Sequence, residues 1–276
     1  MQLSEIRKRL QSVNSTYKLT KATELVATAK LQKYKTLTEV NAQYAQDLKG
    51  FVKAVLSVEI EGKETNPYLD RPVNHNPLHI IITSNSGLCG SYNDDILKFV
   101  WENIPKNEPI FAVGEIGINW LIKNEYTVVK KYTELDDIQP KIINKLIDDI
   151  LVLYTKDEIS TIDVVYTEYI NTLTYMPKME KVLPIKFDEE IESDDIYLEP
   201  SRDELLNELI PMYVSSQIYV IFLSSKTAEN AARRNAMDIA NKNAEELIDE
   251  LKLQSNRARQ AAITQQMNEL SAASQK

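Results

Sequence analysis

The sequence has one cysteine, six glycines and no long apolar run, and each shortage limits what the chain can be. The single cysteine, Cys89, excludes an internal disulfide framework and is typical of a reducing compartment. Because no run of about eighteen apolar residues is present, we expect no membrane-spanning segment. The first five residues, MQLSE, lack the basic and then apolar order of a secretory signal. A chain of 276 residues, 43% apolar and 26% charged, fits one or two domains with a sizeable core.

The residue sets that common catalytic and cofactor sites require are also missing. The turn at 86–90, SGLCG, has two glycines where a dinucleotide fingerprint needs three, and no phosphate-loop motif is present. The only histidines, His75 and His79, make a poor metal set with Cys89 and offer it no evident base. Nothing near the carboxylates of 188–192 would bury one of them and raise its pKa. We therefore expect no catalytic, cofactor or metal site in this chain.

Glycine and proline are absent from residues 212–276, which favours one very long helix. Such a helix would extend roughly 95 Å, more than the width of a small domain. Its apolar positions follow the three-four steps of a coiled-coil seam. The predicted seam consists of Met237, Ala240, Ala244, Leu247, Leu251, Ser255, Ala258 and Ala262. Apolar residues on several sides of 261–270 indicate a tip that is surrounded by other protein.

Residues 1–49 lack glycine and proline as well and predict a second long helix. Its seam comprises Leu3, Ile6, Leu10, Val13, Tyr17, Thr20, Glu24, Ala27, Leu31, Tyr34 and Thr38. Two polar residues, Thr20 and Glu24, interrupt the seam, which costs stability and can fix the register of the helix pair. Since the two helices lie at opposite ends of the chain, we expect an antiparallel or slanted pair.

All six glycines lie between residues 50 and 117, so the part with tight turns is central. Strands alternate there with helices, which predicts an α/β domain with a largely parallel, Rossmann-like sheet and an antiparallel edge. The expected strands are 78–83, 109–114, 126–130, 160–169 and 175–183. We expect a helix at 1–56, a connector at 57–76, a central α/β foot domain at 77–206 and a helix at 207–276. Ser201 and Glu204 form a capping box, and Pro211 follows within the next turns.

The net charge of −9 is unevenly distributed. Residues 1–49 hold nine basic and four acidic residues, a net of +5, and residues 212–276 hold eight and seven, a net of +1. The remainder, 50–211, therefore carries −15. Basic helices on an acidic body indicate an acidic protein partner and argue against a nucleic-acid partner. The acidic stretch 188–208 is expected to be an exposed loop.

Three stretches of the sequence resemble the gamma subunit, the central stalk, of F-type ATP synthases. They are 12–22 (SVNSTYKLTKA), 83–93 (TSNSGLCGSYN), and 231–238 (AARRNAMD) followed by 256–265 (NRARQAAITQ). Their order and spacing match the family along the whole chain. The resemblance implies a coiled coil of the terminal helices within a ring of three alpha and three beta subunits, with the α/β domain as a foot.

The same resemblance implies the partners and the chemistry. ATP or ADP and magnesium would be bound by partner subunits, with no cofactor on this chain. Further implied partners are an epsilon-type or delta-type stalk subunit and, in a true synthase, a c ring, with no nucleic acid and no direct membrane insertion. The expected location is the cytoplasmic face of a bacterial cell membrane, and the matrix face of the mitochondrial inner membrane is the alternative.

Site residues carry over by position. Arg259, Gln260 and Thr264 match the catch that hydrogen-bonds beta-subunit loops. Lys18 and Lys21 lie in the stretch 12–22, which in this family passes the acidic lever of the beta subunit. Glu199 matches, more loosely, the foot region that rests on the c ring.

The sequence departs from the family at two places. Thr23 stands where the family usually has a methionine, and residues 271–276 (SAASQK) replace the usual glycine-containing ending. These departures and the acidic body leave two alternatives open. One is the stalk of an F-type-like ATPase repurposed for other mechanical work, such as mycoplasma gliding or surface machinery, without a conventional c ring. The other is an unrelated α/β enzyme or coiled-coil adaptor.

Overall fold

The structure is a computed structural model that describes residues 3–58, 68–69, 76–133, 140–156, 158–186, 198–199 and 201–273. It contains two compact units. The helix-pair unit comprises Met1–Thr28 and Arg233–Lys276, and the sheet unit comprises Ala29–Ala232. Two long helices, α1 (Leu3–Ser57) and α5 (Arg202–Ala273), contribute to both units. Most of the predicted connector and the acidic residues 188–197 lie outside the described residues.

Both long helices tolerate a residue that usually breaks helices. As predicted, α1 continues past Gly50, which is exposed and costs about 1 kcal/mol relative to alanine. Helix α5 begins at Arg202, where the Ser201 hydroxyl accepts a hydrogen bond of 3.3 Å from the backbone N–H of Glu204. Pro211 lies inside α5 and removes one backbone donor from it.

A five-stranded sheet organises the sheet unit. Its strands lie in the order β3 (Val128–Tyr132), β2 (Ile110–Val113), β1 (Pro77–Ile82), β4 (Thr161–Tyr169) and β5 (Tyr175–Leu183). The pairs β3–β2, β2–β1 and β1–β4 are parallel, and β4–β5 is an antiparallel hairpin. The predicted α/β class with an antiparallel edge is confirmed. Strand β3 starts two residues later than expected because Tyr126 N–H bonds the Leu121 carbonyl and closes the preceding helix.

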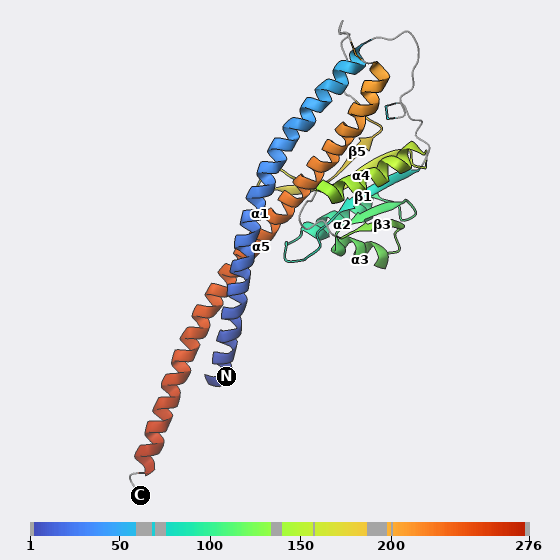
Figure 1. The fold of residues 1–276 in the computed structure, drawn as a ribbon. Coiled ribbons are helices and arrows are strands. Elements are labelled where there is room, and N and C mark those ends of the chain that lie inside the picture. The colour runs from blue at the N-terminus through green and yellow to red at the C-terminus, as the bar shows by residue number, and fades with distance from the viewer. Residues whose placement is uncertain are drawn as a thin grey trace. The chain divides into compact units, whose positions relative to one another are not determined.

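Helices cover both faces of this sheet (Figure 1). Helices α2 (Tyr92–Asn103) and α3 (Glu115–Lys123) pack on one face, where Ile81, Ile96 and Leu121 are fully buried. Helix α4 (Pro140–Thr155) and parts of α1 and α5 cover the other face around a larger core. The chain's two tryptophans lie on the α2–α3 side, with the rings of Trp101 and Trp120 6.2 Å apart.

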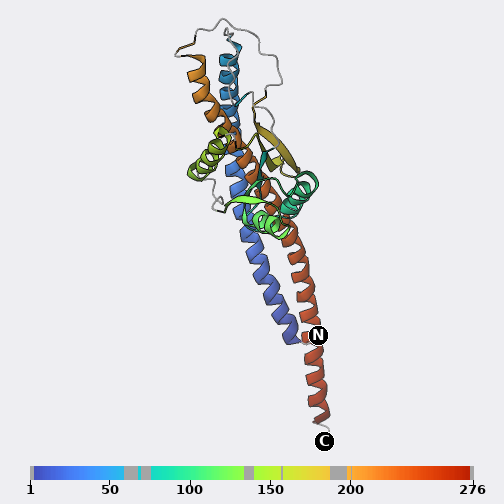
Figure 2. The same cartoon turned by 90° about the vertical axis from the view of Figure 1, so that its right-hand side faces the viewer.

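In the helix-pair unit α1 and α5 run antiparallel, and Figures 1 and 2 show them side by side. Met237 and Leu251 are buried as predicted, but the seam passes through Asn241 and Ile248, not through Ala240 and Leu247. From Met237 the observed seam alternates steps of four and three residues, whereas the predicted seam alternates steps of three and four. Two seam positions are therefore shifted by one residue. The predicted seam position Ala262 is exposed, because α5 extends past the beginning of α1 (Figure 2).

Helix α5 meets the length and composition of a membrane span, against our expectation from the missing apolar run. Its stretch Arg202–Asn268 includes a window of mean hydropathy 1.2, of which 39% is buried. A core helix of a soluble protein passes the same test, and Ile210, Val214 and Ile218 of α5 are fully buried in the sheet unit. The composition therefore indicates a core helix at least as well as a span.

We predict that Gly114→Ala strongly destabilises the sheet unit. Gly114 has a φ of +92°, and a Cβ there would lie 2.4 Å from the Thr83 carbonyl oxygen. The expected loss in unfolding free energy is about 2 kcal/mol or more, measured by urea denaturation. Gly87→Ala is the control, because a Cβ there meets nothing within 4 Å and should change stability by less than about 0.5 kcal/mol. Equal stabilities of the two variants would contradict the strain.

Candidate functional site

A cluster of polar side chains joins the two helices of the helix-pair unit. Thr20 Oγ1 donates to Asn241 Oδ1 at 2.5 Å, and Asn241 Nδ2 donates to Glu24 Oε2 at 2.7 Å. One turn away, Tyr17 OH donates to Glu245 Oε1 at 2.5 Å, which raises the pKa of this tyrosine. The polar interruption predicted at Thr20 and Glu24 is thus bonded to α5.

The two lysines predicted to meet a partner differ in their surroundings. Lys21 Nζ donates to Glu24 Oε2 at 2.9 Å, and this hydrogen bond raises the pKa of the lysine. Lys18 is exposed and pairs with none of the residues that the structure describes. Lys21 is therefore held in place, whereas Lys18 is free to move.

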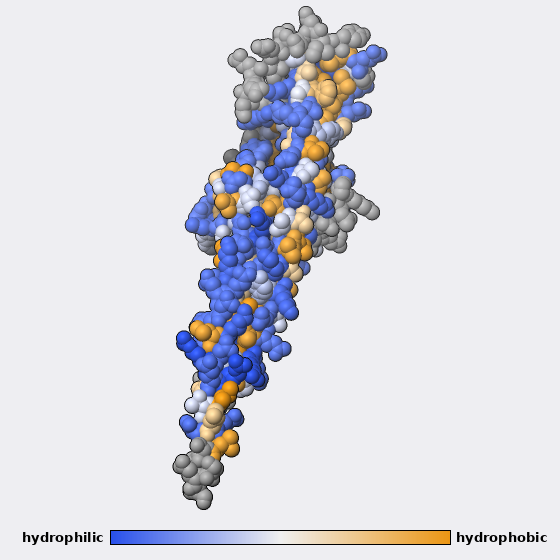
Figure 3. Space-filling view, turned by 90° about the vertical axis from the view of Figure 1, so that its left-hand side faces the viewer, coloured by the Kyte–Doolittle hydropathy of each residue, from blue (hydrophilic) through white to orange (hydrophobic). Residues whose placement is uncertain are grey.

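Large apolar side chains are exposed beside these lysines. Leu19, Leu25 and Val26 of α1 are between 56% and 65% exposed, and Ile239 of α5 is 60% exposed. Figure 3 shows apolar side chains interrupting the hydrophilic surface of the terminal helices. Apolar residues flanked by charges are typical of protein–protein contact surfaces.

Residues 259–268 of α5 are exposed on every side of the helix. Arg259, Gln260 and Thr264 are all exposed, and the Thr264 hydroxyl bonds the backbone carbonyl of Gln260 at 3.0 Å. Within the described part of the chain, no residue pairs with the side chain of Arg259 or Gln260. Exposed apolar residues lie among them: Ile263 at 49%, Met267 at 66% and Leu270 at 71%. An unpaired helix with these exposed apolar side chains needs a partner that covers them.

The glycine-bearing turn at 86–90 is filled by the chain's own side chains. Leu88 and Gly90 adopt positive φ, and Cys89 is buried against Tyr92 and against Ala228 of α5. Asn93 Nδ2 donates to Ser84 Oγ at 2.8 Å and ties the start of α2 to the end of β1. This geometry is that of a tight turn, as the sequence predicts.

A cluster of ionisable side chains lies near the amino ends of the central strands. His79 Nε2 lies 2.6 Å from Glu108 Oε2, and His79 pairs in register with Asp163 of β4. Burial raises the pKa of the Asp163 carboxyl, while Lys181 Nζ, 4.0 Å away, opposes that shift. His79 is 5% exposed and is therefore a core residue of the sheet. Within the described residues, no group of three potential ligands could hold a metal ion.

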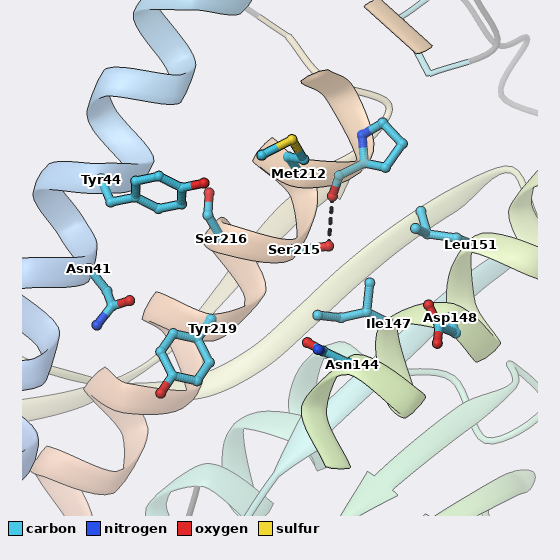
Figure 4. A pocket seen from close by; sticks show the side chains of 11 residues that line it. Asn41, Tyr44, Asn144, Ile147, Asp148, Leu151, Met212, Ser215, Ser216 and Tyr219 are labelled. Carbon is cyan, nitrogen blue, oxygen red and sulfur yellow. Dashed lines mark hydrogen bonds between the residues drawn. The ribbon is translucent and has the colours of Figure 1, made fainter. Parts of the chain in front are cut away.

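A groove of about 670 Å³ opens in the sheet unit between α1, α4 and α5 (Figure 4). Tyr44, Asp148, Met212 and Tyr219 are among its lining residues, and Asp148 carries the lining's only charge. Ser215 Oγ donates to the Pro211 carbonyl at 2.6 Å beside it. Elsewhere in this unit, Glu199 is exposed, whereas the other predicted site residues belong to the helix-pair unit.

Two of the polar residues that join α1 to α5 were not predicted from the sequence. Asn241 and Glu245 are polar residues on a helix whose seam we placed one residue away. The signal that could have found Asn241 is the alternative spacing 237, 241, 244, 248 and 251, which is equally regular.

Comparison with known proteins identifies the family. A family model described as ATP synthase matches residues 2–275. The ATP synthase gamma chain of Clostridium novyi is 35% identical over 275 residues, covering 97% of this chain and 95% of that protein. The gamma chain of Clostridium beijerinckii is 34% identical over 273 residues, with coverages of 97% and 95%.

Solved structures agree on the fold. The rotor of the Euglena gracilis mitochondrial ATP synthase matches with a TM-score of 0.68 and 16% identity, covering 95% of this chain and 98% of that one. The central stalk of the Tetrahymena thermophila enzyme matches with a TM-score of 0.58 and 21% identity, with coverages of 80% and 99%. The fold is thus that of a central-stalk subunit. By sequence, the chain belongs to the family of ATP synthase gamma chains, which are non-catalytic subunits.

We predict that Asp163→Asn changes stability in a pH-dependent way. The raised pKa of Asp163 means that this group favours folding below about pH 4 and that the benefit is lost as pH rises through the folded pKa. The variant should therefore gain stability relative to the original chain between about pH 4 and pH 7, measured by urea denaturation. Asp148→Asn, at an exposed carboxylate, is the control. A difference that is independent of pH would contradict the assignment.

Proposed function

We propose that this chain is the central rotary shaft of an F-type ATP synthase or ATPase, coupling ATP hydrolysis or synthesis on beta subunits to rotation. The observation that carries the proposal is the exposed apolar end of α5, which extends past α1 and needs a surrounding partner. An asymmetric shaft contacts three otherwise equivalent catalytic subunits unequally. Its orientation can therefore favour a different conformation in each of them.

The proposed partners follow from the family. One solved relative is described as OSCP/F1/c-ring and another as central stalk/c-ring. We propose three alpha and three beta subunits around the helix pair, an epsilon-type or delta-type subunit and a c ring at the foot, with Glu199 in the foot contact. ATP, ADP and magnesium would be bound by those partners. We propose the cytoplasmic face of a bacterial membrane as the location, with the chain peripheral to the membrane.

The domain division in this proposal keeps helices at 1–56 and 207–276, a connector at 57–76 and a foot at 77–206.

Purification of the native assembly tests the whole proposal. Copurified alpha and beta subunits with a c ring support a synthase. Copurified alpha and beta subunits with other proteins and no c ring support the repurposed motor. If neither alpha nor beta subunits copurify, or if the isolated chain hydrolyses ATP by itself, both the synthase and the repurposed motor are contradicted.

The first prediction of this proposed function concerns the catch, for which we propose Arg259, Gln260 and Thr264. Arg259→Ala combined with Gln260→Ala should slow ATP hydrolysis by the assembled complex by on the order of ten-fold, because each removes an exposed donor aimed at a partner. The isolated chain should keep its helical circular dichroism. Lys252→Ala is the control, since Lys252 is exposed on the same helix but bonds Asp249 at 2.9 Å. Unchanged turnover in the double variant would refute the catch.

The second prediction concerns the lysines, which we propose meet the acidic beta lever. Replacing Lys18 and Lys21 with glutamate turns two attractions into repulsions and should weaken assembly roughly ten-fold at low salt. The effect should shrink as salt increases, because both side chains are exposed and screened. Lys35→Glu makes the charge change of one of these two replacements at another exposed position of α1 and should have little effect. Assembly that responds equally to all three sites would contradict a specific contact.

A further inference from the structure

One carboxylate connects the exposed surface of α1 to the buried side of α5. Glu24 Oε2 accepts one hydrogen bond from Asn241 Nδ2 at 2.7 Å and another from Lys21 Nζ at 2.9 Å. The Glu24 side chain is only 15% exposed, whereas the Lys21 side chain is 47% exposed. The connection therefore runs from a buried amide on one helix to an accessible ammonium group on the other.

Helix pairing alone does not require this arrangement. Asn241 is 4% exposed and occupies a seam position where an apolar side chain would pack without hydrogen-bond demands. Its amide is satisfied by Thr20 on one side and Glu24 on the other. A buried polar residue of this kind fixes the register of a helix pair at a cost in stability. Here the fixed register also determines where Lys21 lies.

We propose that Asn241 is a positioning residue for Lys21, acting through Glu24 so that α5 determines where α1 presents this ammonium group to an acidic partner. The proposal rests on the proposed function, in which Lys21 meets an acidic partner surface. A lysine held this way loses less side-chain freedom on binding than a free one. Two of its three donors remain available, since Glu24 occupies only one. Force on Lys21 would also reach both helices through the same connection.

Lys18 provides an internal comparison. It lies on the same helix and is exposed, but no described residue holds its ammonium group. Other charges near Lys21 are those of Asp238 and Glu245 on α5, and Lys242 bonds Asp238 at 2.8 Å. Glu24 is the one carboxylate among these that bonds Lys21 directly.

A double-mutant cycle in the assembled complex tests the proposal. Asn241→Leu restores an apolar seam but removes the bond to Glu24, so it separates stability from positioning. Lys21→Gln should weaken binding of the full chain to the alpha–beta ring about three-fold in the original background. The same substitution should have little effect in the Asn241→Leu background. Lys18→Gln should have equal effects in both backgrounds. An unchanged three-fold effect of Lys21→Gln would overturn the proposal.

A second measurement separates this proposal from the partner contact. Nuclear magnetic resonance titration of lysine ammonium groups in the full chain should show a raised pKa for Lys21 that returns toward its ordinary value in Asn241→Leu. If the titration responds but Lys21→Gln is silent in the complex, the partner contact fails and the positioning by Asn241 stands. If the titration does not respond, the positioning fails. If Asn241→Leu does not fold, Glu24→Gln takes its place, because it removes the Lys21–Glu24 ion pair through which Asn241 is proposed to act.

Discussion

The antiparallel contact between α1 and α5 in the helix-pair unit is the interaction on which the proposed activity depends. Each helix is stabilised by the other, because most helical stability in proteins comes from packing an apolar face. The partners lie more than two hundred residues apart in the sequence, as the bond between Tyr17 and Glu245 shows with a separation of 228. The pair can therefore form only after a large loop has closed, and closure costs entropy that the seam must offset.

The seam supplies this stability only as far as α1 reaches. Met237, Ile248 and Leu251 are buried, whereas residues 259–268 and Leu270 are exposed. One helix thus has a paired part and an unpaired part with different requirements. The unpaired part has apolar side chains that a surrounding protein would cover, which is consistent with membership of a family of stalk subunits.

Much of the architecture could be predicted from the positions of glycine and proline. Their absence from the chain ends predicts the two helices, and the strand–helix alternation predicts the parallel sheet with its antiparallel edge. Asn241 was missed because a three-four pattern can start with either step, and only contact with the other helix decides between them. The bond between His79 and Glu108 joins a strand to a loop, and no sequence periodicity encodes such a contact. Lys18, Lys21 and Arg259 are proposed as contact residues through family resemblance, since exposure alone carries no signal of a partner.

The location of both tryptophans in the sheet unit has an experimental consequence. Trp101 and Trp120 lie in edge-to-face contact on the α2–α3 side, and the helix-pair unit contains no indole at all. Tryptophan fluorescence therefore reports the unfolding of the sheet unit alone, while far-ultraviolet ellipticity is dominated by the long helices. Two optical signals recorded on one sample would thus resolve whether the terminal helices come apart before the sheet does, without any added label.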